Sequence, residues 1–460
     1  MTMASPGTLQ DNGRLAPLGL DENSTVLIIG LGKTGLSVAR FLSGRGIRFA
    51  VNDTREKPPS LMDFREQFPD AAVFLGGFEA SAFAAASHLI VSPGVSLQEP
   101  LIQSARRRGI PVLGDLDLFA SMARAPVIGI TGANGKSTVT TLVGLMGEAD
   151  GRKTRVGGNL GTPMLELLDD DAELYVLELS SFQLESSHWL EPMAATVLNI
   201  SPDHMDRYPD IDAYANAKAR IFQGQGLMVL NRDDAMVARM ARDGRPIAWF
   251  SLLDSEADYR LGWVENVEWL LSPGGPLIPR GEVKLQGRHN LANALAAMAL
   301  ADGADISRST QRSILNKFTG LDHRMEWVGE FNRVDWINDS KATNVGACMA
   351  ALAGLDKPVI LIAGGDGKGA DFRLLRPVVR DKVKALILMG KDAPVLESAL
   401  GDLVSTVLVE NMRQAVESAH RLASPGDVVL LAPACASLDQ YKDYQHRGQM
   451  FTDEVRKLAR

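Results

Sequence analysis

The sequence has few cysteines, no long apolar run and no excess of positive charge. Its 460 residues include two cysteines, so no disulfide framework is predicted and a reducing compartment is favoured. No apolar run reaches the roughly 18 residues of a membrane span, and the N-terminal stretch lacks the apolar segment of a secretion signal. The 48 Lys and Arg against 56 Asp and Glu leave a formal charge of −8, which provides no general field for nucleic acid. We therefore expect a cytoplasmic protein with no membrane span and no nucleic-acid partner, which binds anions only at local sites.

The order of strand and helix patterns predicts the fold class. Short β-branched runs alternate with helical patterns, which predicts an α/β protein with largely parallel sheets covered by helices. Three segments, residues 26–35, 127–138 and 359–369, each begin as a strand and end in a glycine-rich turn. Because 460 residues exceed one hydrophobic core, three α/β domains are expected. The predicted units are a flexible extension over residues 1–20 and domains over residues 21–114, 115–320 and 321–460.

The strongest local signal is the run GITGANGKST, from Gly129 to Thr138. It lies between a predicted strand and a predicted helix and resembles a P-loop, although Ile130 stands where that pattern has glycine. Backbone N–H groups of such a turn and the positive end of the helix bind phosphates. Lys136 would reach the outer phosphates of a nucleotide, and Ser137 or Thr138 would bind Mg²⁺. A chance glycine-rich turn is the alternative.

A second glycine turn, GLGKTG at residues 30–35, follows the first predicted strand. Asp53 stands about twenty residues further on, after another strand, as in a dinucleotide-binding fingerprint. This pattern alone would suggest an NAD-dependent oxidoreductase, with Asp53 on a ribose hydroxyl. The same geometry suits any ligand with a pyrophosphate at a helix N-terminus, UDP included. The turn therefore predicts a nucleotide site of undetermined base, with a purely structural turn as the alternative.

Polar residues after other predicted strands complete the set of candidates. Glu178 ends an apolar run and would be a hard oxygen ligand for Mg²⁺, while His204, Asp206 and Lys218 follow the next strand. Read singly, His204 is an ordinary loop residue and Lys218 a solvated lysine. In the last third, three turns offer lysines or hydroxyls that would suit a dicarboxylate, unless they are simply turns rich in small residues. These turns hold Lys341 and Thr343, then Lys368, then Ser437 and Tyr444.

Read in order, these segments resemble the Mur ligase family. The motifs that carry the resemblance are TGANGKSTVTTL, VGGNLGTP, ELYVLELSSFQLE, NISPDHMDRYP, GRHNLANALA, GLDHRMEWV, INDSKATN, GGDGKGADF and PACASLDQYKDYQHRG. The resemblance implies a Rossmann-like N-terminal domain for a UDP-linked substrate, a central P-loop ATPase-type domain and a Rossmann-like C-terminal domain for an amino acid. It implies ATP-dependent formation of an amide between UDP-N-acetylmuramoyl-L-alanine and D-glutamate, through an acyl phosphate, in peptidoglycan precursor synthesis. We expect a monomer.

The same resemblance implies roles for individual residues. The expected catalytic residues are Lys136, Glu178, His204 and Lys218. ATP is expected at Gly132, Asn134, Gly135, Lys136, Ser137, Thr138, Asn293, Arg324 and Asp339. The UDP-linked substrate is expected at Lys33, Thr34, Asp53, Thr54, Arg55, Gly94 and Asn159, and D-glutamate at Lys341, Thr343, Lys368, Ser437 and Tyr444. Two Mg²⁺ sites are expected around Ser137, Glu178, His204 and Lys218, the last as a carbamate, because a carbamate offers oxygens where an ammonium would repel the ion.

Two positions depart from the family pattern, and several alternatives stay open. Lys33 stands where an apolar residue is expected, which adds a cation near the phosphates, and Tyr444 stands where phenylalanine is expected. The other candidates are sibling ligases for L-alanine, a diamino acid or a dipeptide, a folylpolyglutamate synthase, and a regulatory nucleotide-binding module. The N-terminal domain argues against the folate enzyme. A diamino-acid ligase would be expected to carry an Asn-Pro-Arg motif in its last domain, and this sequence has none there.

Overall fold

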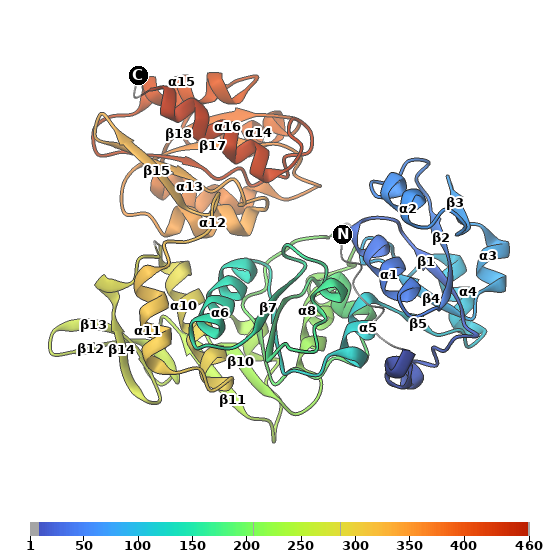
Figure 1. Ribbon diagram of the computed structural model, residues 1–460. Coiled ribbons are helices and arrows are strands. Elements are labelled where there is room, and N and C mark those ends of the chain that lie inside the picture. The colour runs from blue at the N-terminus through green and yellow to red at the C-terminus, as the bar shows by residue number, and fades with distance from the viewer. Residues whose placement is uncertain (1–8, 206, 286, 459–460) are drawn as a thin grey trace, which may run out of the picture.

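The computed structural model describes residues 9–205, 207–285 and 287–458, and it contains three β-sheets with helices packed on them (Figure 1). The three sheets follow one another along the chain. In Figure 1 the unit built on the central sheet, drawn from teal to yellow, lies between the blue N-terminal unit and the orange to red C-terminal unit. The predicted α/β class with mostly parallel sheets is confirmed.

The N-terminal sheet is parallel throughout and has the strand order β3-β2-β1-β4-β5. Its central strand β1 is apolar and almost wholly buried, as expected for a parallel strand covered on both faces. The order reverses between β1 and β4, so a crevice opens at the carboxyl ends of these strands. The elements are β1 Thr25–Ile29, α1 Lys33–Ser43, β2 Arg48–Asp53, α2 Leu61–Gln67, β3 Val73–Leu75, α3 Ala80–Ala85, β4 His88–Val91, α4 Pro100–Arg107 and β5 Val112–Leu113.

The central sheet has the order β14-β13-β12-β11-β10-β9-β6-β8-β7, parallel from β7 to β12 and antiparallel beyond. Strand β6 lies between β8 and β9, so the order of the strands reverses beside it. The glycine turn after β6 therefore lies at a switch point of the sheet, where ligands bind in open α/β sheets. The strands are β6 Val127–Thr131, β7 Thr154–Gly158, β8 Leu174–Glu178, β9 Ala194–Val197, β10 Leu227–Asn231, β11 Ile247–Ser251, β12 Tyr259–Val264, β13 Val267–Ser272 and β14 Gly275–Pro279. The helices are α5 Asp115–Met122, α6 Lys136–Ala149, η2 Met164–Leu167, α7 Ser181–Ser186, α8 Ile211–Ala219, η3 Arg220–Phe222, α9 Ala235–Ala238, η4 Arg280–Glu282, α10 Arg288–Gly303 and α11 Arg308–Lys317.

The C-terminal sheet has the order β15-β16-β20-β17-β18-β19 and is parallel except for the edge strand β15. Its core strands β17 and β20 are apolar along their whole length and buried on both faces. The elements are β15 Glu326–Phe331, β16 Val334–Asn338, α12 Val345–Ala353, β17 Val359–Gly364, η5 Phe372–Leu375, α13 Arg376–Lys382, β18 Val383–Met389, α14 Ala393–Leu400, β19 Ser405–Leu408, α15 Met412–Leu422, β20 Val428–Leu431 and α16 Tyr444–Lys457.

The segment before the first strand differs from its prediction. Residues Leu9–Leu18 form the 3-10 helix η1, which packs against α5. Leu15, Leu18 and Leu20 are buried in the first hydrophobic core, and the Arg14 guanidinium donates to the Met122 carbonyl at 3.2 Å. The expectation of a loose extension is therefore wrong for residues 9–20, because three leucines in an otherwise polar stretch bury enough apolar surface to fix it. Residues 1–8 lie outside the described part of the chain.

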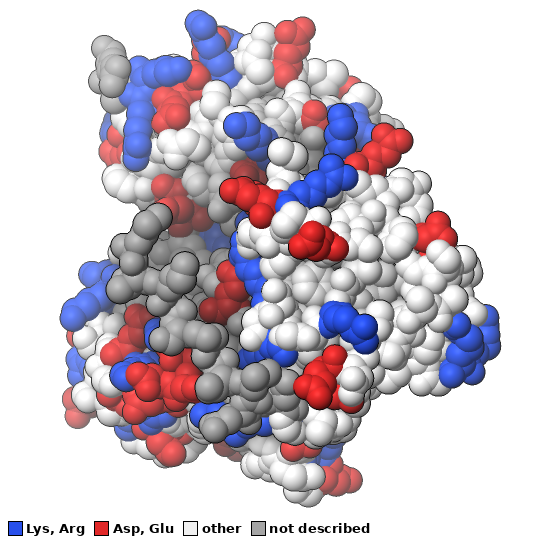
Figure 2. All heavy atoms as spheres, turned by 45° about the vertical axis from the view of Figure 1, so that its right-hand side comes forward, with Lys and Arg blue, Asp and Glu red and all other residues white. Residues whose placement is uncertain are grey.

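The domain limits and the surface complete the description. The first sheet ends at Leu113 and the central sheet at Pro279, and we propose boundaries at residues 114/115 and 320/321. Within the residues that the structure describes, no helix is long and apolar enough to cross a membrane. Figure 2 shows Lys and Arg interspersed with Asp and Glu over the visible face, with broad uncharged areas between them.

Candidate active site

The turn between β6 and α6 has the geometry of an anion-binding loop. Gly132 and Gly135 have positive φ angles of 150° and 86°, and a Cβ at Gly135 would lie 2.4 Å from Asn293 Oδ1. The Asn134 backbone N–H donates to Asn199 Oδ1 at 2.8 Å, which fixes the turn to the loop after β9. The turn therefore needs its glycines, and it directs backbone N–H groups and the N-terminus of a 14-residue helix toward one point.

Lys136 begins α6 and lies over this turn. Its Nζ donates to the carbonyl oxygens of Gly132 and Ala133, both at 2.9 Å. Burial lowers the pKa of Lys136, the carboxylates Glu178 and Asp203 oppose that shift, and the cation Arg324 adds to it. The lysine is thus held at the mouth of the turn by neutral carbonyls, from which it can turn toward a phosphate.

A chain of polar contacts joins the P-loop to β8 and to the C-terminal domain. Ser137 Oγ donates to Glu178 Oε2 at 2.5 Å, and Asn159 Nδ2 donates to Glu178 Oε1 at 2.7 Å. Arg324, which lies between α11 and β15, donates from Nη2 to Ser137 Oγ at 2.6 Å. Glu178 is only 3% exposed at the end of β8. The serine hydroxyl and the carboxylate are hard oxygen donors of the kind that Mg²⁺ prefers.

Lys218 on α8 is buried next to this site. It is 1% exposed, its Nζ donates to Thr131 Oγ1 at 3.3 Å, and it lies 4.6 Å from the centre of the Tyr214 ring. Burial lowers the pKa of Lys218 well below its usual value, and the nearby cation Lys136 lowers it further. Burial in this position thus favours the uncharged amine over the ammonium. The interpretation of Lys218 as an ordinary solvated lysine is wrong.

His204 lies in the loop after β9. It has a left-handed φ of 58°, its ring centre lies 4.8 Å from that of Phe182, and its Nε2 is 3.7 Å from Asp203 Oδ2. Across the described ranges, no group of three or more His, Cys, Asp or Glu side chains gathers closely enough to hold a metal ion. Of the residues expected around two Mg²⁺ ions, the structure joins Ser137 and Glu178 by a direct hydrogen bond. Asp206 lies outside the described residues.

A cavity of about 370 Å³ lies between α10, the P-loop and the start of the C-terminal domain. Of the residues expected to bind ATP, those lining it are Asn134, Gly135, Thr138, Asn293, Arg324 and Asp339. Burial raises the pKa of Asp339 to about 7, against the opposing effect of Arg324. His289, which the sequence did not single out, also lines this cavity; burial lowers its pKa to about 4, so its ring is neutral.

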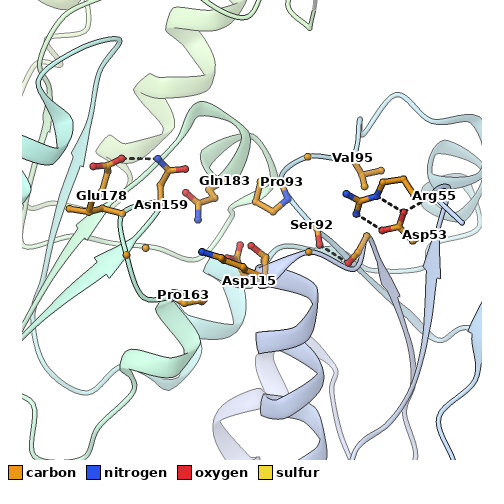
Figure 3. A pocket seen from close by; sticks show the side chains of 18 of the residues that line it. Asp53, Arg55, Ser92, Pro93, Val95, Asp115, Asn159, Pro163, Glu178 and Gln183 are labelled. Carbon is orange, nitrogen blue, oxygen red and sulfur yellow. Dashed lines mark hydrogen bonds and ion pairs between the residues drawn. The ribbon is translucent and has the colours of Figure 1, made fainter. Parts of the chain in front are cut away.

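A larger cavity of about 760 Å³ runs between the N-terminal and central domains. All the residues expected to bind the UDP-linked substrate line it, together with Ser137 and Glu178. In Figure 3 the pair Asp53 and Arg55 lies at one end and the pair Asn159 and Glu178 at the other. The larger cavity therefore reaches from the N-terminal glycine turn to Ser137, the residue after the P-loop lysine, and to Glu178.

The N-terminal glycine turn is built around Asp53. Gly30 has a φ of 93°, and a Cβ at Gly35 would lie 2.0 Å from the Gly30 carbonyl oxygen, so α1 approaches β1 very closely. Asp53 Oδ2 accepts from the Leu31 N–H at 2.7 Å, and the Arg55 guanidinium donates to both carboxylate oxygens, at 2.8 and 2.6 Å. Burial favours a higher pKa for Asp53, but these hydrogen bonds outweigh it and the pKa is lowered. The carboxylate orders the turn and Arg55.

The residues expected to bind D-glutamate are only partly brought together. Lys341 and Tyr444 line the larger cavity, with Lys341 Nζ 4.0 Å from the centre of the Tyr444 ring. Lys341 also lines the smaller cavity, and burial lowers its pKa to about 8, helped by Arg324 and Lys136. Thr343, Lys368 and Ser437 line neither cavity.

Asp203 is a candidate that the sequence did not reveal. Its charge acts on Lys136, Lys218 and Lys341, and its Oδ2 accepts from Asn344 Nδ2 of the C-terminal domain at 3.2 Å. Nothing in the sequence separates this aspartate from any loop aspartate. Its position among the lysines follows only from the fold.

The comparisons with known proteins agree with this geometry. The family description "Mur ligase MurD-like, N-terminal domain" matches residues 24–114, "Mur ligase middle domain" matches 130–301, and "Mur ligase, glutamate ligase domain" matches 323–435. The chain belongs to the Mur ligase family, whose members are ATP-dependent ligases. The oxidoreductase and the non-catalytic module are thereby ruled out.

Individual relatives indicate which Mur ligase this chain resembles. A protein of Methylococcus capsulatus is 59% identical over 96% of this chain and 96% of its own length, and one of Nitrosococcus oceani is 52% identical over 96% and 98%. Both are named UDP-N-acetylmuramoylalanine--D-glutamate ligase. Among solved structures, the UDP-N-acetylmuramate-alanine ligase of Thermotoga maritima aligns with a TM-score of 0.59 at 17% identity, covering 95% of this chain and all of that one, which shows a shared fold.

Proposed function

We propose that this ligase joins D-glutamate to the carboxylate of UDP-N-acetylmuramoyl-L-alanine, with ATP converted to ADP and phosphate, in peptidoglycan precursor synthesis. One observation carries the proposal: a single cavity runs from the N-terminal glycine turn to Ser137 and Glu178 beside the P-loop. A ligand with its diphosphate at the first turn would present its far end where a phosphate is transferred. The names of the relatives support the same reaction.

The chemistry requires positive charge between the two reactants. A carboxylate forms an amide only with a leaving group, which the γ-phosphate of ATP supplies as an acyl phosphate. The D-glutamate amine then attacks the acyl carbon, and phosphate leaves. Because the first step brings two anions together, positive charge would stabilise its transition state. Arg324 and Lys341 line the smaller cavity, and Lys136 lies over the P-loop beside it.

Ser137 and Glu178 are the residues that would hold Mg²⁺ at the nucleotide, since both present oxygen donors. When bound, Mg²⁺ neutralises charge on the phosphates and orients them. We assign a second ion to His204 and to Lys218 as its carbamate. The burial of Lys218 supports this assignment because it favours the uncharged form of the amine, and that form reacts with CO₂, forming an N–C bond and losing a proton.

Domain closure would complete the D-glutamate site. The C-terminal domain already contacts the central one through Arg324 and Asn344, and a Cβ at Gly346 would lie 2.7 Å from Ser201 Oγ. We infer that it closes further when substrates bind, which would bring Thr343 and Lys368 to the cavity and exclude water from the acyl phosphate. Small-angle scattering should show a smaller radius of gyration with an ATP analogue and the UDP-linked substrate, and identical curves would contradict closure.

The proposed active unit is a single chain in the cytoplasm. Both cavities are lined by residues of one chain, and the buried free thiols of Cys348 and Cys435 suit a reducing compartment. Light scattering at assay concentrations should give a mass near 49.6 kDa. Specific activity that rises with protein concentration would instead indicate an obligate oligomer.

The reaction is tested by phosphate release from ATP in the presence of UDP-N-acetylmuramoyl-L-alanine. Release should require D-glutamate and should be absent with L-glutamate, L-alanine or diaminopimelate. ATP and the UDP-linked substrate should raise the melting temperature, whereas NAD should not. Release supported equally by another amino acid would redirect the proposal to a sibling ligase.

A further inference from the structure

Asp115 is a buried carboxylate in the wall of the larger cavity. It is the first residue of α5, directly after the N-cap Gly114, and it is only 3% exposed. It lines the cavity together with residues of both domains. Figure 3 shows it between the Asp53–Arg55 end and the Asn159–Glu178 end. None of the roles assigned above to other residues uses Asp115.

One oxygen of this carboxylate lacks a partner. Gln183 hydrogen-bonds the Asp115 side chain, and the backbone at Leu116 contributes another hydrogen bond. Because Gln183 Oε1 already accepts from the N–H and the hydroxyl of Ser180, its amide nitrogen is the group that meets Asp115. Among the described residues, nothing hydrogen-bonds the buried Asp115 Oδ1. A buried acceptor without a donor is unfavourable and rare in folded proteins.

Charge strengthens the case. Burial raises the pKa of Asp115 to about 6, the Gln183 hydrogen bond lowers it, and the neighbouring Asp117 raises it. The group is therefore mostly ionised at neutral pH and can only accept hydrogen bonds. Asp117, on the same helix, is equally buried, but its oxygens accept from the N–H groups of Gly114 at 3.1 Å and His188 at 2.7 Å. Both oxygens of Asp117 are thus used within the fold, whereas Oδ1 of Asp115 is not.

We propose that Asp115 is a specificity residue whose Oδ1 accepts a hydrogen bond from an amide N–H of the substrate, between the nucleotide and the reacting carboxylate. This inference rests on the proposed function, whose substrate has two such groups, the acetamido N–H of the sugar and the N–H that joins alanine to the lactoyl group. An amide N–H donates once and accepts nothing, so a single buried oxygen satisfies it completely. A hydroxyl would bring its own acceptor sites into the same buried position and leave them unsatisfied.

The test combines enzyme variants with substrate analogues in a double cycle. Each analogue carries an ester oxygen in place of one of the two N–H groups and keeps the reacting carboxylate. With the natural substrate, Asp115→Ala should lower kcat/KM by about tenfold to a hundredfold through KM for the UDP-linked substrate, with KM for ATP and D-glutamate unchanged. One of the two analogues should lower kcat/KM of the wild-type enzyme by a similar factor. The same analogue should not lower kcat/KM of Asp115→Ala any further.

The controls separate this role from a structural one. Asp115→Asn keeps the shape and should show a smaller KM change with the same pattern across analogues, so it serves if the alanine variant is unstable. Asp117→Asn should lower the melting temperature and leave the response to both analogues as in wild type. If the losses in kcat/KM caused by the variant and by the analogue simply multiply for both analogues, the two changes are independent. That result would overturn the inference and leave the proposed function intact. Wild-type enzyme that fails to use the natural substrate would overturn the proposed function and the inference together.

Discussion

The glycine turns after β1 and after β6 both lead from a parallel strand into a helix, and they differ in the charges around them. At the first turn, the acid Asp53 is bound to Arg55 and to the backbone, and Lys33 is exposed at the start of α1. At the second turn, Lys136 and Arg324 converge with the Glu178 carboxylate and the Ser137 hydroxyl. A helix N-terminus alone suffices to hold a diphosphate, whereas moving a phosphate requires cations and oxygen donors together.

The charged side chains at the two turns also differ in how deeply they are buried. The ionic pair Asp53 and Arg55 is half exposed on its arginine side, so it mainly orders the turn. Around the second turn, Lys218 and Glu178 are almost completely buried, and electrostatic interactions there are stronger because water is excluded. Substitutions at the second turn should therefore change the rate of the reaction, and those at the first should change binding.

The largest expected effect is at the second turn. Lys136→Ala should reduce phosphate release by about a thousandfold or more, because it removes the cation at the transferred phosphate. Isothermal titration should still detect the UDP-linked substrate with nearly unchanged affinity, since the first turn is intact. A variant with wild-type turnover would remove the assignment of the P-loop as the phosphate-transfer site.

A backbone change should break the first turn without touching the second. Gly35→Ala would bring a Cβ to 2.0 Å from the Gly30 carbonyl oxygen, which cannot move without distorting β1. We expect a loss of about 3 kcal/mol in the free energy of unfolding and the loss of UDP-substrate binding. Urea denaturation and titration with the UDP-linked substrate measure the two effects separately, and titration with ATP is the control. Loss of ATP binding to a similar extent would mean that the two turns are not independent.

Variants of Lys218 test whether the active form of this residue is the free amine or its carbamate. Lys218→Ala should lower kcat by about a hundredfold, with partial recovery on addition of formate or acetate, which can replace the carbamate oxygens. Lys218→Arg is the matched control, because an arginine keeps a cation and cannot react with CO₂. Full activity of the wild-type enzyme after thorough removal of CO₂ would argue against the carbamate.

The smallest effect is expected at Lys33. Lys33→Leu should raise KM for the UDP-linked substrate by about threefold to tenfold and leave kcat unchanged, since an exposed cation contributes about 1 kcal/mol to anion binding. The dependence of KM on salt concentration should become weaker. An unchanged KM and salt dependence would show that the side chain points away from the diphosphate.

The local motifs were readable from the sequence because their chemistry depends on neighbouring residues. Three of these motifs lie where their patterns predicted: the turn from Gly132 to Lys136, the turn before Lys33, and Glu178 at the end of its strand. Contacts between distant segments were not readable, such as Arg324 on Ser137 or Asp203 among three lysines. These depend on how the C-terminal domain sits on the central one, which no short-range pattern encodes.

Two further cases show the limits of local patterns. The buried leucines of η1 were read as part of a loose segment because their neighbours are Gly, Pro and polar residues, and composition averages hid three well-spaced apolar side chains. The proposed D-glutamate residues Thr343, Lys368 and Ser437 were grouped by resemblance, and they line neither cavity in this arrangement of the domains. Their grouping stays a prediction that depends on closure.

Lys341 lines both cavities and is the one described lysine that does so. A single buried amine therefore borders both the space expected for the nucleotide and the space expected for the UDP-linked precursor. A synthetic anion bound to Lys341 would be expected to compete with both reactants.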